Sequence, residues 1–368
     1  MTSEWNHFAL GEITELVIDY RGKTPKKLGG DWCKQGYRAL SAKNIKTGRI
    51  VQAETIRYID ESLYRKWMKD EVQRGDILIT SEAPFGQIFF WDSDEKIVLS
   101  QRLFCVRIKP EYDARFIYYY MTTPEFQSEL DGRATGTTVI GLRQPELMKC
   151  VIRCPEIQEQ KVIAAILSSI DAKIIANEKV NDNLQQQAAA IFRSWFVDCA
   201  PFGGKTPDEW ENVTLEDITA LVSRGITPKY ADDTDQIVIN QKCIRNHMID
   251  LSLARTHTPK VINEKWLRFG DLLVNSTGDG TLGRAAQVWF QPKNLTVDSH
   301  VTIARPAKEN LIFYIGLWGI LHEKEIESLH IGSTGQTELP RDRVKAMELL
   351  LPDNDTLDRF NALITPMA

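Results

Sequence analysis

The stretch from Glu156 to Asp198 contains neither glycine nor proline over 43 residues and is rich in Ala, Gln, Glu and Lys. This composition favours one continuous helix. At ~1.5 Å per residue, such a helix is about 60 Å long. A single globular core does not need so long a rod, so we expect this helix to hold two parts of the chain apart. A buried helix of a bundle is the alternative that the pattern leaves open.

Apolar side chains recur three and four residues apart along this stretch. They are Ile163, Ile166, Ile170, Ile174, Leu184, Ala188, Ile191 and Trp195. This spacing is typical of a heptad-like stripe that packs against another helix. Asn177 and Asn181 lie on the same stripe, and a buried asparagine penalises misaligned pairing. The two asparagines therefore favour a paired helix with a fixed register.

The chain also repeats itself at long range. The pattern from Trp5 to Val17 returns from Trp210 to Val222. Four further patterns return in the same order: Arg-Gly-x-Thr-Pro-Lys at 21–26 and 224–229, Lys-x-Ile at 43–45 and 242–244, Gly-Asp-x-Leu-x-x-Ser at 75–81 and 270–276, and Thr-Gly-x-Thr at 135–138 and 334–337. Unrelated domains do not keep such an order, so the sequence predicts a tandem duplication.

Each copy has the pattern of an α+β domain of roughly 150 residues. The segments RGDILITS, FGDLLVNST, QRLFCVRI and HVTIARP predict strands, and FIYYYMTTPEFQSEL and LIFYIGLWGILHEKEIESL have helical periodicity. We expect a recognition domain at 1–155, a spacer helix at 156–198, a second domain at 199–352 and the start of another helix at 353–368. Leu357, Phe360 and Ile364 share one face of this last helix.

Bulk composition limits the compartment and the class. A chain of 368 residues is long enough for two domains and a connector. It has no signal-like amino terminus and no 18-residue apolar run, so we expect a cytoplasmic protein outside the membrane. The six cysteines lack zinc-site spacing and are expected to be buried, reduced thiols. The net charge of −5 argues mildly against a nucleic-acid ligand, but residues 21–49 hold nine Lys or Arg against one acid.

Four segments resemble the specificity subunit of Type I restriction–modification systems. They are ALSAKNIKTGRI, GDILITSEAPFGQIFFW, TGTTVIGLRQPELMKCVIRCPEIQEQKVIAAILSSIDAKI and AAAIFRSWFVD, in this order. The resemblance implies two target-recognition domains in a pseudo-twofold arrangement, each reading half of a split double-stranded DNA sequence. It also implies conserved helices that set the spacing between the halves. Modification (methyltransferase) subunits are expected to dock on those helices, and restriction (motor–nuclease) subunits to join them.

The resemblance is incomplete at the second helix. The family pattern continues with a second long helix, antiparallel to the first. Here only about a dozen residues of it follow position 353, and Pro366 discourages continuation. We therefore expect a truncated second helix and a first helix whose apolar stripe another chain covers. The expected docking residues are Ile163, Ile166, Ile170, Ile174, Leu184, Ile191 and Trp195.

Basic and hydroxyl-bearing loops are the candidates for contact with DNA. In the first copy they are Arg21, Lys23, Thr24, Lys26, Lys27, Lys43, Asn44, Lys46, Thr137 and Thr138. In the second copy they are Arg224, Thr227, Lys229, Gln241, Lys242, Arg245, Thr334 and Gln336. Such side chains neutralise phosphates and reach base edges. An ordinary solvated face and plain tight turns are the alternatives for the basic run and for the Thr-Gly loops.

Catalytic motifs are missing from the sequence. It has no GxxxxGK[ST] loop, no GxGxxG after a strand and no Asn-Pro-Pro-aromatic motif, and its six histidines lack metal spacing. We expect a non-catalytic subunit, with S-adenosylmethionine, ATP and Mg²⁺ bound only by partner subunits. Two alternatives stay open: a coiled-coil scaffold with duplicated protein-binding domains, and an enzyme with an active site in one groove.

Overall fold

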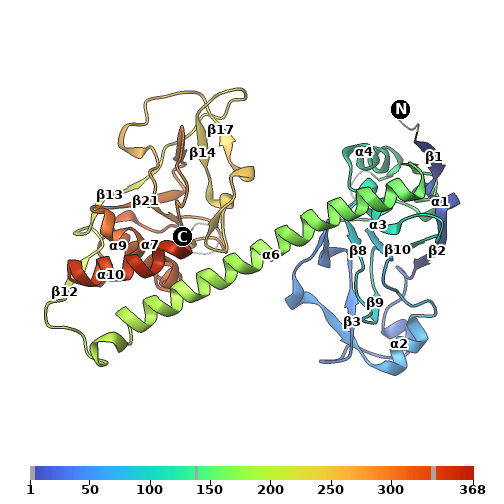
Figure 1. Ribbon diagram of the computed structural model, residues 1–368, viewed down its shortest axis with the longest axis horizontal. Coiled ribbons are helices and arrows are strands. Elements are labelled where there is room, and N and C mark those ends of the chain that lie inside the picture. The colour runs from blue at the N-terminus through green and yellow to red at the C-terminus, as the bar shows by residue number, and fades with distance from the viewer. Residues whose placement is uncertain (1–4, 137–139, 333–336) are drawn as a thin grey trace. The chain divides into compact units, whose positions relative to one another are not determined.

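The computed structural model describes residues 5–136, 140–332 and 337–368. The chain divides into two compact units, residues 1–176 and 177–368 (Figure 1). The division falls inside the long helix, whereas the sequence placed the whole helix between two domains. Each unit therefore contains one half of the helix together with one copy of the repeat.

Short strands form four groups in the first unit. The largest is a four-stranded sheet in the order β2-β10-β7-β8, and a three-stranded sheet has the order β6-β3-β9. Two pairs, β1–β11 and β4–β5, complete the set. The bounds are β1 Asn6–Ala9, β2 Thr14–Asp19, β3 Tyr37–Leu40, β4 Ile45–Lys46, β5 Arg49–Ile50, β6 Arg57–Ile59, β7 Ile77–Thr80, β8 Ile88–Phe90, β9 Ile97–Leu99, β10 Leu103–Ile108 and β11 Val151–Cys154.

The second unit repeats this topology strand for strand. Its sheets are β13-β21-β18-β19 and β17-β14-β20, and its pairs are β12–β22 and β15–β16. In both units the only parallel pairing between named strands of the described chain is in the three-stranded sheet, β3–β9 and β14–β20. The bounds are β12 Glu211–Thr214, β13 Thr219–Arg224, β14 Ile237–Ile239, β15 Ile244–Arg245, β16 Met248–Ile249, β17 Arg255–Thr256, β18 Leu272–Asn275, β19 Ala285–Gln287, β20 Leu295–Val297, β21 Val301–Pro306 and β22 Glu348–Leu351. The predicted duplication is confirmed.

The four-stranded sheet of each unit is buried on both faces. In β7, Ile77 and Ile79 face a core formed with the helices, and Leu78 faces the core shared with the three-stranded sheet. In β18, Leu272 and Leu273 divide between two cores in the same way. Successive side chains along a strand point to opposite faces, so a strand that lies between two cores is apolar at every position.

Helices cover the outer face of these sheets. In the first unit these helices are α1 Leu10–Ile13, α3 Ala114–Met121, α4 Pro124–Arg133 and α5 Gln144–Leu147, while α2 Glu61–Trp67 packs in the core shared with the three-stranded sheet. In the second unit they are α7 Ile312–Leu321, α8 Glu323–Ser328, α9 Arg341–Lys345 and α10 Asn354–Ile364. The predicted helical segments thus form α3 and α4 in one copy and α7 and α8 in the other. Pro366 lies in a 3-10 turn, Thr365–Met367, that follows α10.

The repeated Gly-Asp motif forms a buried ion pair in each copy. The Arg107 guanidinium donates to both carboxylate oxygens of Asp76, each at 2.8 Å. Arg305 makes the same two contacts with Asp271, also at 2.8 Å, and the side chains are 7% and 0% exposed. Buried charges of this kind persist because they are paired and fully hydrogen-bonded. The repeated aspartates therefore support the fold.

The long helix α6 runs from Ile157 to Phe196, slightly shorter than predicted (Figure 1). Cys199, with φ +49°, and the glycines that follow break the helical conformation. Near its start, Ala164 joins the first core and Gln160 is buried, donating to the Pro155 carbonyl at 2.8 Å. Each end of the helix is thus part of a different unit.

The last turns of α6 pack against α10 within the second unit. Phe196 lies 4.8 Å from the Phe360 ring and 4.9 Å from the Tyr314 ring, and Phe192 is 2% exposed. Ile191 and Trp195 are partly buried against the same core. The short helix that the sequence predicted after residue 353 therefore covers only the end of α6.

The middle of the predicted stripe is exposed in this chain. Ile166, Ile170 and Ile174 are 56%, 50% and 46% exposed, and Asn177 and Asn181 are exposed as well. A stripe buried along its full length within the chain is therefore not observed, as expected if another chain covers it. The expectation of six buried cysteines is wrong for Cys33, which is exposed, while the other five are buried.

Candidate nucleic-acid interface

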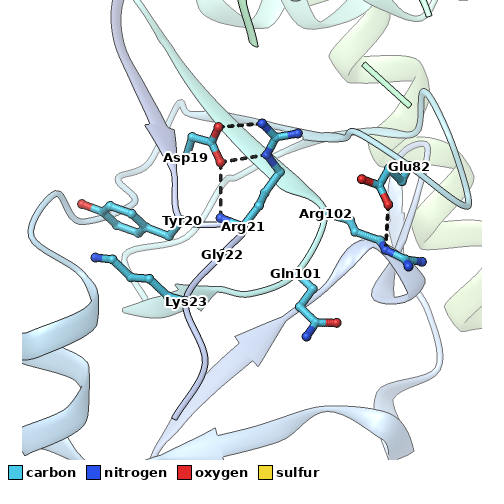
Figure 2. A pocket seen from close by; sticks show the side chains of 8 residues that line it. All are labelled: Asp19, Tyr20, Arg21, Gly22, Lys23, Glu82, Gln101 and Arg102. Atoms are coloured by element: carbon cyan, nitrogen blue, oxygen red, sulfur yellow. Dashed lines mark hydrogen bonds and ion pairs between the residues drawn. The ribbon is translucent and has the colours of Figure 1, made fainter. Parts of the chain in front are cut away.

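The end of β7 and the start of β10 bring three segments of the first copy together. The Ser81 N–H donates to the Arg102 carbonyl at 2.9 Å, and the Ser81 carbonyl accepts from the Leu142 N–H at 2.9 Å. The chain leaving β2 runs past the same place and forms an open hollow (Figure 2). Arg21, Lys23, Glu82, Gln101 and Arg102 line it, and we call this set the strand-end surface of the first repeat.

Arg21 is held firmly on this surface. Its guanidinium donates to both carboxylate oxygens of Asp19 at 2.8 Å and to the Leu142 carbonyl at 3.3 Å, and it stacks over the Phe104 ring at 4.1 Å. With three of its N–H donors bonded inside the protein, Arg21 ties the end of β2 to the segment that contains Leu142. This contact helps to position that segment.

Arg102 and Glu82 form a second ion pair on the other side of the hollow (Figure 2). The Nε of Arg102 lies 3.0 Å from Glu82 Oε2, and their side chains are 49% and 35% exposed. Arg102 has φ +65°, a left-handed conformation that is uncommon outside glycine. Its neighbour Gln101 is exposed. These three side chains are accessible polar groups beside the ends of β7 and β10.

Lys23 is partly withdrawn from solvent. Its ammonium donates to the Trp67 carbonyl and lies 3.6 Å from the centre of the Tyr20 ring. Burial, together with the nearby charge of Lys69, lowers the pKa of Lys23. A lysine held in this way is a weaker candidate for phosphate contact than a free one.

The second copy builds the same junction with different side chains. The Ser276 N–H donates to the His300 carbonyl at 2.8 Å, and the Ser276 carbonyl accepts from the Leu339 N–H at 2.8 Å. Arg224 donates to the Leu339 carbonyl at 2.7 Å and to Glu338 at 2.6 Å. We call Arg224, Gln241, Thr277, His300 and Glu338 the strand-end surface of the second repeat.

Thr277 is the hub of the second surface. Its hydroxyl lies 2.8 Å from His300 Nδ1 and 3.1 Å from Gln241 Oε1. The Gln241 carbonyl also accepts from Asn275 at 3.0 Å. The His300 N–H donates to Asp298, whose carboxyl pKa is raised by burial. Thr277, Gln241 and His300 thus form one hydrogen-bonded group, and Arg224 and Glu338 form a separate pair.

A short turn carries further cations beside each surface. In the first copy this turn is a 3-10 helix, η2 Ala42–Asn44, and the Ala42 N–H donates to the Gln101 carbonyl at 3.1 Å. Its counterpart is η5 Gln241–Cys243. Exposed basic residues on or after these turns are Lys43, Lys46, Lys242 and Arg245, and Lys26, Lys27 and Lys229 are exposed on the preceding loops.

Residues 2–186 match the family described as Type I restriction modification DNA specificity domain. The chain belongs to this family. As a specificity subunit it recognises DNA sequence, and the alternative of a protein-binding scaffold is not favoured. The predicted family and function are confirmed, and the net negative charge was a misleading guide to the ligand.

Curated relatives are specificity subunits too. The chain is 24% identical over 321 residues to the Type I restriction enzyme MjaIX specificity subunit of Methanocaldococcus jannaschii, covering 80% of this chain and 71% of that protein. It is 28% identical over 194 residues to the MjaVIII specificity subunit of the same organism, covering 51% and 44%. The solved S subunit of a Type I system from M. genitalium has the same fold, with 14% identity and a TM-score of 0.59 over 100% of this chain and 90% of that chain.

The structure does not place every predicted DNA-contact residue at the protein surface. Asn44 is only 1% exposed; its amide accepts from Ser41 at 2.9 Å and donates to Thr55 at 3.0 Å. A contact between Asn44 and DNA is therefore withdrawn, because the amide holds the turn in place. Thr24 is half-buried and accepts from the Lys27 N–H at 3.4 Å, and Thr227 is exposed. Thr137, Thr138, Thr334 and Gln336 lie outside the described residues.

Several surface residues were missed from the sequence. Glu82, Gln101 and Arg102, and likewise Thr277 and His300, come from strand ends rather than from basic runs. A signal was available, because Glu82 and Thr277 directly follow the last matching residue of the repeated Gly-Asp motif. The first position at which the two repeats differ after a matching motif is thus a candidate for a side chain that varies on a conserved backbone.

Metal sites and membrane-spanning helices are two further features to consider for residues 5–136, 140–332 and 337–368. Within these ranges, no group of three or more His, Cys, Asp or Glu side chains is arranged to hold a metal ion. In the same part of the specificity subunit, no helix is long and apolar enough to cross a membrane.

Proposed function

We propose that this specificity subunit reads a two-part sequence in double-stranded DNA, one part with each repeat. The observation that carries the proposal is the duplicated junction: the same main-chain hydrogen bonds at Ser81 and Ser276 support different side chains. Two copies of one framework suit two segments of one duplex, because B-DNA presents the same backbone geometry to each. The differing side chains suit two different sequences.

Exposed cations that both repeats retain are the proposed phosphate contacts. Three pairs occupy matching positions: Lys26 and Lys229, Lys43 and Lys242, and Lys46 and Arg245. A phosphate contact is independent of sequence, so both repeats need it. Arg21 and Arg224 are also retained, but several of their N–H donors bind groups of the protein itself.

The exposed stripe of α6 is the proposed docking surface for modification subunits. It consists of Val162, Ile166, Ile170 and Ile174, spaced four residues apart and each 46–59% exposed. Covering a large apolar side chain stabilises a complex by about 1.5–3 kcal/mol. We propose that the helix also sets the spacing between the two reading surfaces, and that restriction subunits join through the modification subunits.

Catalysis is proposed to reside in those partner subunits, which act with this chain in the cytoplasm. S-adenosylmethionine, ATP and Mg²⁺ then bind to the partners. Titration calorimetry on the purified specificity subunit is expected to show binding of neither S-adenosylmethionine nor ATP. Micromolar affinity for either would contradict this assignment.

Exchange of one repeat tests the reading of a two-part sequence. Residues 1–155 are replaced by those of a relative, and the chain is expressed with its modification subunits. Single-molecule sequencing then maps the methylated bases. One half of the methylated motif is expected to change while the other half stays; a change in both halves would refute separate reading. The matched control replaces residues 199–352 and is expected to change only the other half.

A further inference from the structure

The internal repeat separates two kinds of DNA contact. Phosphates are alike along any duplex, so residues that bind them are retained between repeats, as Lys43 and Lys242 are. Base edges differ with sequence, so residues that read them diverge while their main-chain support stays fixed. A surface position with a retained backbone and an exchanged polar side chain therefore meets the requirement for base readout.

Arg102 and His300 meet this requirement. Each residue lies between a strand of the three-stranded sheet (β9 or β20) and an inner strand of the four-stranded sheet (β10 or β21). The carbonyl of each residue accepts a hydrogen bond from a matching serine N–H, Ser81 at 2.9 Å and Ser276 at 2.8 Å. Both side chains are exposed. The main-chain hydrogen bond is thus retained, while a guanidinium on a residue with φ +65° in one repeat is replaced by an imidazole in the other.

Their contact partners are exchanged along with them. Glu82 and Thr277 directly follow the matching serines, and each contacts its neighbour across the junction: Glu82 meets Arg102 at 3.0 Å, and Thr277 meets His300 at 2.8 Å. A phosphate site does not suit a carboxylate, because the two anions repel. The paired exchange therefore favours base edges over the DNA backbone as the ligand of these positions.

We propose that Glu82–Arg102 and Thr277–His300 are the specificity-determining pairs of the two repeats. Glu82 holds Arg102 through its Nε, and the two Nη groups have no partner among the described residues. A guanidinium held in this orientation donates two parallel hydrogen bonds to guanine O6 and N7 in the major groove. The first repeat is therefore assigned a G·C pair at this position. This assignment rests on the proposed reading of one half-sequence by each repeat.

Transplanting one pair tests the assignment. The double variant E82T/R102H gives the first repeat the pair of the second, and it is expressed with the modification subunits for a map of methylated bases. The matched control, E61T/R65H, alters a Glu–Arg pair on α2 whose Arg and Glu side chains are 76% and 61% exposed. We expect the transplant to change or relax one base pair in one half of the motif, and the control to leave the motif unchanged.

The conservative variant Arg102→Lys keeps the positive charge but removes the guanidinium that can donate two parallel hydrogen bonds. In binding assays with the purified methyltransferase complex, it is expected to lose roughly 10- to 100-fold in preference for the G·C pair, with the other half of the motif still required. This variant decides the matter if the double variant does not fold. Wild-type preference and an unchanged motif in Arg102→Lys would overturn the assignment.

The wild-type map separates this inference from the function on which it rests. If the wild-type complex methylates no two-part motif, the proposed function fails. If it does so, and both Arg102→Lys and the transplant methylate the same motif as the wild type, only the assignment of these pairs fails. The reciprocal variant T277E/H300R provides an independent readout, because its expected change lies in the other half.

Discussion

At the scale of single residues, Arg107 and Arg305 hold two aspartates almost entirely away from solvent. Asp76 and Asp271 are 1% and 0% exposed, and each also accepts a main-chain N–H, from Gln73 and Arg268, at 2.8 Å. A buried carboxylate of this kind tolerates loss of its cation poorly, because the remaining charge has no compensation. Substitution of the aspartate of the Gly-Asp motif therefore measures how much this buried ion pair stabilises each repeat.

Replacing Asp271 by Asn is expected to destabilise the second repeat by about 3–5 kcal/mol, because Arg305 is left buried without its partner. Urea unfolding followed by tryptophan fluorescence measures the change. The control, Asp342→Asn, alters an ion pair in which the aspartate is 78% exposed, and is expected to cost about 0–1 kcal/mol. An equal decrease in the free energy of unfolding in the two variants would show that the buried ion pair contributes no more than the exposed one.

His247 gives the second repeat a predicted dependence on pH. Its Nδ1 lies 3.3 Å from Glu323 Oε1, which raises the pKa of the imidazole. Protonation therefore favours the folded chain, so the added stability is present below about pH 6.5 and is lost as the pH rises through the higher pKa of the folded state. Comparison of His247→Gln with the wild type by urea unfolding should show a deficit that shrinks with increasing pH. The exposed His7→Gln serves as control, and a deficit independent of pH would contradict the prediction.

At the scale of elements, α6 has a different surface at its ends and in its middle. Phe192 and Phe196 are buried in the second core, whereas Ile166, Ile170 and Ile174 are about half exposed. The aromatic end packs against α10, and no described residue covers the aliphatic stretch in the same way. The helix thus belongs to the fold at its ends and is available for a partner between them.

The double variant Ile166→Glu/Ile170→Glu is expected to weaken binding of modification subunits by about 100-fold or more, because two large apolar contacts are lost. Light scattering coupled to gel filtration measures the complex. Lys173→Glu, an exposed change on the same helix, controls for added negative charge. Circular dichroism should show both variants folded. Undiminished complex formation by the double variant would remove this stripe from the docking surface.

Elements with strong periodicity were predictable from the sequence, whereas the site was predictable only in part. The run of residues without glycine or proline predicted α6, and the repeated Gly-Asp motif predicted β7 and β18. The interior position of Asn44 was not predictable, because its five hydrogen-bonding contacts come from residues as far as 11 positions away. Arg102 was missed because its meeting with Glu82 depends on strand pairing between distant segments.

At the scale of the whole molecule, DNA recognition has to act against a net charge of −5. Local clusters decide the contact, since exposed charges are screened beyond about 10 Å at 0.1 M salt. Lys26, Lys43 and Lys46 in the first repeat and their counterparts in the second supply exposed positive charges on the proposed DNA-contacting loops. The distribution of charge therefore matters more than its sum.

The affinity of the methyltransferase complex for its DNA is expected to depend less steeply on salt after Lys43→Gln. Each lost phosphate contact reduces the slope of log K against log salt by about 0.9 and weakens all sequences alike. Lys66→Gln, an exposed change on α2, is the control. Fluorescence anisotropy between 50 and 200 mM salt, a range over which such contacts are commonly resolved, measures the slope. An unchanged slope would exclude Lys43 from phosphate contact.

The pairing of the first and last strands of each repeat has a consequence for synthesis on the ribosome. β1 pairs with β11, and β12 with β22, so neither repeat can close until its final strand has been made. The second closure requires about 200 further residues, a delay of roughly 10–40 s at ordinary rates of translation. We expect the first repeat to be protease-resistant in nascent chains while the second is still open. During this interval the first repeat is folded and the apolar stripe of α6 is exposed. Binding of a partner subunit to the nascent chain is then an advantage, because it covers the stripe.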